Sequence, residues 1–273
     1  MSLLHLIILA IVQGITEFLP ISSSGHLILI PELTGWQDQG LVIDVAAHLG
    51  TLGAVLIYFW RDTRGLTLAM FGALGIRAAR RRLEGSHYTR LFWLLALATL
   101  PVVGAGLIFV QLGLADALRR ADVIGAASIL FGLLLYYVDQ RSAAEKEIKS
   151  LGLRAALTVG LAQVLALVPG TSRAGITMTA ARALGFRRDE AAHFSMLLAI
   201  PTILAAAALG IWELAAQEAA APVGDGLLVA ALAFLTALGA IHFLMRWLQT
   251  ASMTIFVAYR VVLGAALLAW VYY

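Results

Sequence analysis

Two polar segments, each embedded in a long apolar stretch, carry the residues best suited to chemistry. Residues 13–26 contain an amide, a carboxylate, three consecutive hydroxyls and an imidazole, on Gln13, Glu17, Ser22, Ser23, Ser24 and His26. Residues 171–177 contain hydroxyls and a guanidinium, on Thr171, Ser172, Arg173 and Thr177. Ionisable groups inside hydrocarbon cost roughly 2.5–3.5 kcal/mol each on insertion, so their presence there indicates function. A base, a fixed cation and several donors favour phosphoryl chemistry, in which charge develops on non-bridging oxygens.

In the first segment, the spacing places the acid and the amide side by side. Glu17 follows Gln13 by one helical turn, so both side chains project from the same face. The three serines precede a second apolar stretch and can cap a helix there, which is the usual role of serine at such a position. The free N–H groups at the positive end of a helix dipole also form an anion site. His26 is within helical reach of Ser22 and Ser23, which suits either proton transfer or a plain interhelical hydrogen bond.

The second segment repeats this arrangement and adds a permanent charge. Arg173 carries a planar guanidinium that is suited to bidentate contact with phosphate oxygens. Thr177 follows Arg173 by one turn, shares its face and is expected to donate a further hydrogen bond. Both segments together therefore predict a site for a phosphate or diphosphate inside a membrane.

Four other ionisable residues lie in apolar stretches and are weaker candidates. Asp44 and His48 are one turn apart, and they form either a second layer around the site or a pair that satisfies itself. His193 is expected to be a hydrogen-bonded histidine at a helix end. Arg260 is expected to reach the membrane surface or to pair with a neighbour.

Composition predicts an integral membrane protein. The 273 residues are 61% hydrophobic and 13% charged, whereas soluble domains keep about 25% charged residues. Residues 92–113 carry no charge, and about 20 apolar residues are enough to cross the hydrocarbon core. The chain has no cysteine, which excludes disulfides and thiolate metal sites. Although the sequence pI is about 9.4, the basic residues follow the topology described below, so no nucleic-acid partner is expected.

The order of apolar stretches predicts an all-α membrane fold in one domain, residues 1–273. The stretches are 3–19, 41–60, 92–113, 122–138, 153–168, 190–212, 226–247 and 254–272. The first and fifth are broken, at Pro20 and at Pro169-Gly170, and each resumes as a short apolar segment. We interpret the chain as two repeats of about five helices, 1–140 and 150–273, each opening with a re-entrant helix-loop-helix. Six full crossings and an inverted second repeat follow, and such paired breaks point to a midplane site.

Arginine and lysine are distributed unevenly across this topology. With re-entrant breaks, fifteen of the nineteen fall on one side, which the positive-inside rule identifies as cytoplasmic. They are the basic residues of segments 61–91 and 139–154 together with Arg182, Arg187, Arg188 and Arg246. Arg119 and Arg120 lie on the opposite side. Both termini are then outside, as is an acidic loop at 213–225 that includes Glu218.

At the two breaks the sequence resembles the undecaprenyl-diphosphate phosphatase family, integral membrane lipid pyrophosphatases of the bacitracin-resistance type. Residues 13–26, QGITEFLPISSSGH, are similar to its (E/Q)xxxE motif running into PxSSxGH. Residues 169–177, PGTSRAGIT, are similar to its PGxSRSxxT motif, and the resemblance covers essentially the whole chain. It implies hydrolysis of undecaprenyl diphosphate to undecaprenyl phosphate and inorganic phosphate, to recycle the carrier lipid for cell-wall synthesis. It also implies the bacterial plasma (inner) membrane, a site open to the outer, periplasmic face, and a divalent cation, Mg²⁺ or Ca²⁺.

The resemblance also implies roles for individual residues. Ser23 is the nucleophile or a close phosphate contact, Glu17 the base or the cation ligand, and His26 the proton donor. Water and His26 remain alternatives to Ser23 as the attacking group. The residues implied to hold the diphosphate are Arg173, Ser172 and Thr177, and those expected near it are Gln13, Ser22 and Ser24. Gln13 stands where many members have glutamate, and Ala174 replaces a common serine, so a two-carboxylate metal site is in doubt.

Two other functions are compatible with parts of the pattern. Type 2 phosphatidic acid phosphatases share a Ser-Gly-His and a Ser-Arg element, but their nucleophilic histidine would fall at position 179, which is Thr179. A transporter or flippase for a lipid phosphate would use the same phosphate site without a nucleophile. Undecaprenyl diphosphate and membrane lipid are the expected partners, and the sequence leaves homo-oligomers open.

Overall fold

The chain is helical, as its sequence predicts, in a computed structural model that describes residues 1–143, 145–216 and 223–273. Residue Glu218 of the predicted acidic loop lies outside these ranges. The elements in chain order are α1 (Leu3–Thr16), α2 (Ser23–Thr34), α3 (Gly40–Tyr58), α4 (Trp60–Ala73), α5 (Arg77–Arg82), α6 (Tyr88–Gln111), α7 (Leu114–Ala117), α8 (Ala121–Arg141), η1 (Ile148–Ser150), α9 (Leu153–Gln163), η2 (Val164–Leu167), α10 (Arg173–Ala183), α11 (Arg188–Ala216), α12 (Val223–Thr250) and α13 (Thr254–Tyr272).

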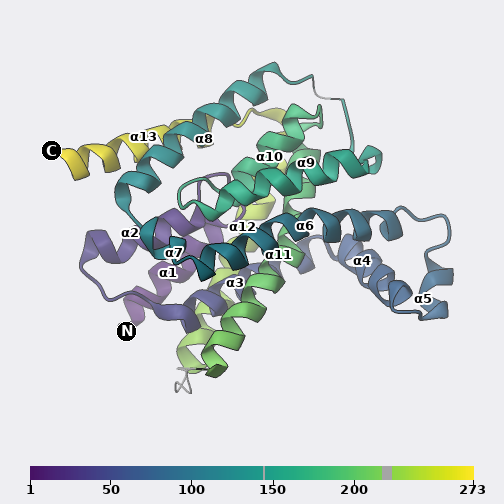
Figure 1. The fold of residues 1–273 in the computed structure, drawn as a ribbon, viewed down its shortest axis with the longest axis horizontal. Helices are drawn as coiled ribbons and strands as arrows, with labels where there is room; N and C mark the ends of the chain where they lie inside the picture. The colour runs from purple at the N-terminus through teal and green to yellow at the C-terminus, as the bar shows by residue number, and fades with distance from the viewer. Residues whose placement is uncertain (144, 217–222) are drawn as a thin grey trace.

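Six helices of the described ranges are long and apolar enough to cross a membrane, which agrees with the six predicted crossings. They are α3, α6, α8, α11, α12 and α13. The shorter apolar helices α1 and α9 each end just before a break, and α2 and α10 follow the breaks (Figure 1). The protein is therefore a multi-pass membrane protein. The interpretation as two repeats, 1–140 and 150–273, stays a prediction.

Both breaks have the same backbone conformation. Ser22 and Ser172 have positive φ angles of 76° and 69°, and they are the non-glycine residues of the described ranges that do so. In each, the Oγ atom accepts a hydrogen bond from the backbone N–H three residues on, from Gly25 at 3.3 Å and from Gly175 at 3.1 Å. A non-glycine residue held at such a positive φ angle lowers the stability of the fold by about 1–3 kcal/mol. The capping bonds offset part of that cost and fix where α2 and α10 begin.

The helices before the breaks are held by close backbone approach to long helices. A Cβ atom on Gly14 of α1 would overlap Ala233 and Thr236 of α12. A Cβ atom on Gly160 of α9 would likewise overlap the backbone of Ala98 on α6. Glycine at both positions lets the helices pack at a distance that a larger residue would prevent, and so sets the position of each break.

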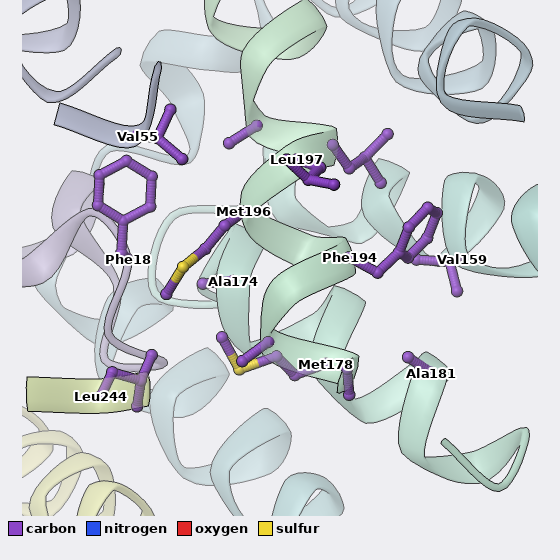
Figure 2. Close-up of a cluster of buried hydrophobic side chains, with 14 of the residues drawn as sticks. Phe18, Val55, Val159, Ala174, Met178, Ala181, Phe194, Met196, Leu197 and Leu244 are labelled. Carbon is purple, nitrogen blue, oxygen red and sulfur yellow. The ribbon is translucent and has the colours of Figure 1, made fainter. Parts of the chain in front are cut away.

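Helix α11 packs beside residues of both breaks. It contacts α3, α6, α10 and α12, and its buried side chains pack into the main apolar core (Figure 2). Core residues drawn from both breaks and from the long helices include Phe18, Ala174, Met178, Phe194, Met196, Leu197 and Leu244. This packing on a single rigid helix brings segments that are about 150 residues apart in the chain to one place.

A buried ion cluster fixes the opposite end of α10. Arg182 donates from Nε to Asp139 Oδ1 at 2.9 Å, and Arg188 donates from Nε to the same oxygen at 2.9 Å. Arg182 is only 1% exposed, so its charge is buried and paired. The cluster joins α8, α10 and α11 about nine residues beyond the second break, which is roughly 14 Å along a helix axis.

Candidate functional site

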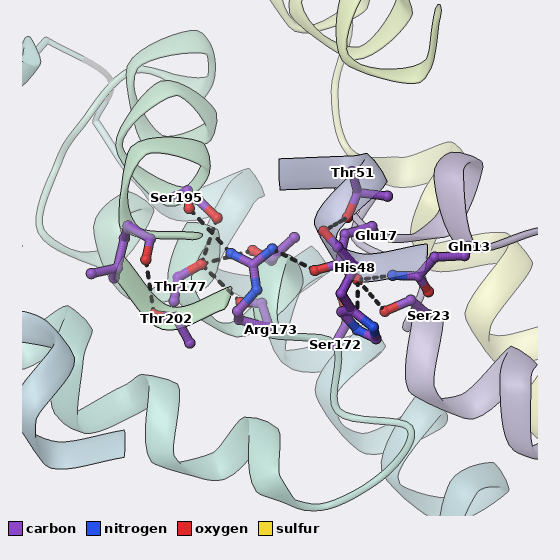
Figure 3. Close-up of polar contacts among 12 residues, drawn as sticks. Gln13, Glu17, Ser23, His48, Thr51, Ser172, Arg173, Thr177, Ser195 and Thr202 are labelled. Carbon is purple, nitrogen blue, oxygen red and sulfur yellow. Dashed lines mark hydrogen bonds and ion pairs between the residues drawn. The ribbon is translucent and has the colours of Figure 1, made fainter. Parts of the chain in front are cut away.

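The two breaks meet at the carboxylate of Glu17. Arg173 of the second break donates from Nη2 to Glu17 Oε1 at 3.0 Å. Ser23 of the first break donates from Oγ to Glu17 Oε2 at 2.7 Å, and Gln13 donates from Nε2 to the same oxygen at 2.9 Å. Figure 3 shows Arg173 reaching across to Glu17 from the opposite element. Glu17, Ser23 and Arg173 are therefore brought together as the sequence predicts.

These groups line a cavity of about 170 Å³. Its walls come from both breaks, α3 and α11: Glu17, Ser22, Ser23, Ser24, His48, Ala166, Ser172, Arg173, Thr202, Ile203 and Ala206. The first residues of α2 and α10, Ser23 and Arg173, both border it. Two helix N-termini thus border one space, and the positive ends of two helix dipoles favour an anion there.

The guanidinium of Arg173 is held from behind by α11. Its Nη1 donates to the carbonyl of Ser195 at 3.3 Å. Thr177, which is fully buried, makes a 2.7 Å hydroxyl contact with Ser195 and also donates to the carbonyl of Arg173 at 2.8 Å. Thr177 does not line the cavity. In this structure its hydroxyl therefore contacts Ser195 and the carbonyl of Arg173, and its contact with a substrate stays a prediction.

Of the other serines at the two breaks, two cap helices and one is exposed. Ser22 and Ser172 use their Oγ atoms as helix caps. Ser24 is exposed, and its hydroxyl lies 3.4 Å from that of Ser22. Ser23 is left as the hydroxyl that borders the cavity and contacts a carboxylate, which is the arrangement an activated nucleophile needs.

His26 is held outside the cavity wall. Its Nδ1 lies 2.7 Å from the carbonyl of Ser22, and because a carbonyl only accepts, Nδ1 carries the proton. Its Nε2 is then the acceptor for the Tyr259 hydroxyl of α13 at 2.6 Å. The ring therefore has both nitrogens satisfied in this conformation, and any proton donation to a substrate needs the Tyr259 bond to break first.

Asp44 and His48 are not a side-chain pair. The Asp44 carboxylate accepts from Gln39 Nε2 at 2.9 Å, whereas His48 Nδ1 lies 2.7 Å from the Asp44 backbone carbonyl. His48 Nε2 points to Glu17 Oε2 at 3.8 Å. The structure therefore brings His48 to the cavity and leaves Asp44 outside its lining.

Arg260 corrects one expectation. It neither reaches the membrane surface nor pairs with an acid among the described residues; its side chain is 0% exposed. Nη2 donates to the carbonyls of Gly170 and Thr171 at 3.0 and 2.9 Å, and Nη1 donates to that of Pro20 at 3.4 Å. Arg260 thus hydrogen-bonds to both broken loops and holds them together.

His193, as expected, is partnered, with its Nε2 3.1 Å from Asp62.

Oxygen donors suitable for a cation gather beside Glu17. Within the described ranges, no group of three or more His, Cys, Asp or Glu residues is arranged to hold a metal. The available donors are the Glu17 carboxylate, the Ser23 hydroxyl and Gln13 Oε1, which is buried and has no hydrogen-bond partner among the residues that the structure describes. Mg²⁺ is often held by one or two carboxylates plus substrate phosphates. These residues fit a cation that shares ligands with a bound diphosphate, not one held by protein alone.

Two residues at the site carried no signal in the sequence. Ser195 and Thr202 are single hydroxyls in an apolar helix, and only the fold shows that both face the breaks. Thr202 donates to the carbonyl of Leu198 at 2.8 Å and lies 3.4 Å from Gln163 Oε1. Gln163 lies at the end of α9 as Glu17 lies at the end of α1. This match was the one sequence feature that pointed to the surroundings of Thr202.

Comparison with known proteins shows the family of this chain. The chain is 50% identical to the undecaprenyl-diphosphatase of Ruegeria pomeroyi and to that of a Jannaschia species, in each case over 100% of both chains. It is 46% identical to the undecaprenyl-diphosphatase of Alcanivorax borkumensis over 97% of each chain. Residues 6–266 match the family model described as bacitracin resistance protein BacA. Both breaks lie inside that match, and this chain belongs to the bacitracin resistance protein BacA family.

Proposed function

We propose that this protein hydrolyses undecaprenyl diphosphate to undecaprenyl phosphate and inorganic phosphate, which recycles a carrier lipid for cell-wall synthesis. The observation that carries the proposal is the contact of Ser23 and Arg173 with the two oxygens of one carboxylate, at the wall of one cavity. A nucleophile, a base and a fixed cation are then in mutual reach. The names of the similar proteins support the same reaction.

The surroundings of the cavity suit a substrate with a lipid tail. An apolar groove of about 180 Å³ lies between α6 and α11, with Val102, Leu107 and Leu209 in its walls. Thr202 and Ala206 line both the groove and the polar cavity. An isoprenoid chain leaving a diphosphate in the cavity can therefore follow this groove toward the bilayer without crossing a polar wall.

The contacts support the following reaction. Glu17 accepts the Ser23 proton as Ser23 Oγ attacks the terminal phosphorus, and the bond to the bridging oxygen breaks to release undecaprenyl phosphate. Once the proton on Glu17 has passed to solvent through the cavity, water attacks the phosphorylated serine, and Glu17 takes a proton from the water and returns it to Ser23 Oγ as inorganic phosphate leaves. Arg173 and the N–H groups of α2 and α10 stabilise charge on the non-bridging oxygens. His26 would donate to the leaving oxygen only after it releases Tyr259 and gains a proton on Nε2, because that nitrogen is an acceptor outside the cavity lining in this structure.

The donors beside Glu17 support a divalent cation, Mg²⁺ or Ca²⁺, as cofactor. Glu17 and Gln13 Oε1 would hold it together with diphosphate oxygens, and when bound it would offset phosphate charge. Gln13 Oε1 supports this assignment because a buried carbonyl oxygen without a partner is costly, and a cation would satisfy it.

The proposed orientation puts the cavity on the outer side of the bacterial plasma membrane, with both termini outside. His48 at the cavity lies on α3, whereas Arg61 and Arg64 follow the far end of that helix. In this cysteine-free chain, Tyr273→Cys should react with a membrane-impermeant thiol reagent on intact cells, and Ser86→Cys should not. The opposite pattern would invert the topology.

Phosphate release by purified protein tests the function directly. In detergent with Mg²⁺ or Ca²⁺ supplied, the protein should release phosphate from undecaprenyl diphosphate, and Glu17→Gln should lose most of that activity. Tight binding of the lipid diphosphate without phosphate release would favour a lipid-phosphate transporter or flippase instead.

A further inference from the structure

A helical hairpin extends from the bundle on the side of α6. It consists of α4, the turn at residues 74–76 and α5, and it is called the α4–α5 hairpin below. Helix α4 packs on α6, and α5 packs on α4. Figure 1 shows α5 at the edge of the molecule, away from the helices that carry the phosphate site.

The hairpin is strongly basic, and its arginines form no ion pair with any residue that the structure describes. Six exposed arginines lie on it: Arg61, Arg64, Arg77, Arg80, Arg81 and Arg82. Within the part of the chain that the structure describes, none forms an ion pair, and Arg80 alone makes a hydrogen bond, to the carbonyl of Gly72 at 3.2 Å. The nearby acid Asp62 is engaged with His193 and Tyr88. This charge is therefore available to a partner.

Large apolar side chains are exposed next to these charges. Leu74 is 72% exposed and Ile76 is 48% exposed, and both sit in the turn between the two helices. Met70 and Phe71 on the last turn of α4 are each 39% exposed. A groove of about 260 Å³ between α4 and α5 is lined by apolar residues, with Arg82 at its wall. Neither nucleic acid nor an acidic protein surface would cover such apolar side chains as well as lipid does.

We propose that the α4–α5 hairpin is a membrane-surface anchor that binds anionic phospholipid headgroups. The arginines would contact lipid phosphates while Leu74 and Ile76 enter the boundary between headgroups and acyl chains, as in amphipathic interfacial helices. Each basic residue near an anionic surface contributes about a factor of five in affinity, which corresponds to about 1 kcal/mol. This site is distinct from the phosphate cavity and does not rest on the proposed reaction.

A spin label at a single cysteine measures the insertion directly, because the chain has no cysteine of its own. Leu74→Cys, labelled and reconstituted in phosphatidylcholine nanodiscs, should move toward the acyl region as phosphatidylglycerol is added. Leu112→Cys is the matched control, since Leu112 is 65% exposed near the other end of α6. Its depth should not change with lipid charge. Equal depth of the Leu74→Cys label in neutral and anionic lipid would overturn the proposal.

A charge-matched pair of variants tests the role of the arginines. Arg81→Gln with Arg82→Gln should raise the phosphatidylglycerol fraction that half-saturates the Leu74→Cys response by on the order of tenfold. Arg119→Gln with Arg120→Gln removes the same charge from residues already paired with Asp38 and Asp122, and should leave that response unchanged. Thermal unfolding of Leu74→Cys, of Leu112→Cys and of the two arginine double variants checks that all four proteins remain folded. A similar effect from both pairs would reject the hairpin as the anionic-lipid site.

Discussion

The two breaks of this protein share a backbone and differ in charge. Each has a capping serine with positive φ, Ser22 or Ser172, whose hydroxyl accepts from the N–H of a glycine three residues on. The residue that follows the cap is Ser23 in the first break and Arg173 in the second. Both of these residues bond to Glu17. One conformation thus presents a hydroxyl, the proposed nucleophile, on one side and a fixed cation on the other.

The difference indicates how a single loop geometry serves two purposes. In the first break, the carboxylate of Glu17 lies next to the hydroxyl of Ser23, so proton transfer is possible. In the second break, the corresponding helix end carries Gln163, which cannot take a proton, and Arg173 is held by α11. The first break is therefore expected to carry the reaction and the second to hold the phosphates. Arg260 keeps the two in register through its bonds to both loops.

The largest expected effect is that of removing the nucleophile. Ser23→Ala should lower phosphate release by on the order of a thousandfold or more, because the reaction loses its attacking group. Binding of the lipid diphosphate should persist, since Arg173 and both helix N-termini remain. The matched control is Ser24→Ala, which removes a neighbouring hydroxyl that does not contact Glu17 and should cost less than about tenfold. If Ser23→Ala keeps most of its turnover, water or His26 is the attacking group.

Replacing the cation tests the second break. Arg173→Lys keeps the charge but loses the planar fork, and lysine cannot reach Glu17 and the Ser195 carbonyl together. Activity should fall by about a hundredfold, if a charge-assisted contact is worth ~3 kcal/mol. Steady-state phosphate release measures the loss, with Arg64→Lys on the exposed hairpin as control. Near-normal turnover in Arg173→Lys would show that the second break does not hold the reacting phosphate.

The breaks were predictable from sequence because polar and ionisable residues stand out inside apolar stretches. Glu17, Ser23 and Arg173 all come from such segments. The six crossing helices were predictable as well, because the bilayer sets their length and composition. The supporting contacts were not predictable. Ser195 is an ordinary hydroxyl in an apolar helix, and Arg260 meets the loops only through packing of α13 on α8. The contacts of Thr177 and Asp44 were not predictable either, because helical spacing gives a face but not what that face contacts.

Thr177 offers a smaller and sharper test of the second break. The structure places its hydroxyl against Ser195 and behind Arg173. Thr177→Val should therefore lower kcat by about tenfold or less and leave KM near its normal value, since one hydrogen bond contributes about 0.5–1.5 kcal/mol. Ser195→Ala should have a similar effect, and the double variant should be no worse than either alone. A raised KM with unchanged kcat in Thr177→Val would mean that Thr177 contacts the substrate.

The smallest effect is expected at Gln13, and it bears on the cation. Gln13→Ala removes a neutral ligand and should cost only a few-fold in rate, far less than Glu17→Gln, because an amide cannot act as base. Gln13→Glu instead places a second carboxylate beside Glu17. Like charges this close repel, so the variant should depend more steeply on Mg²⁺ or Ca²⁺ and reach half-maximal rate at a lower cation concentration. Phosphate release across a cation titration measures both variants. An unchanged titration curve in Gln13→Glu would place the cation away from Glu17, and the first break would then act through Ser23 and Glu17 alone.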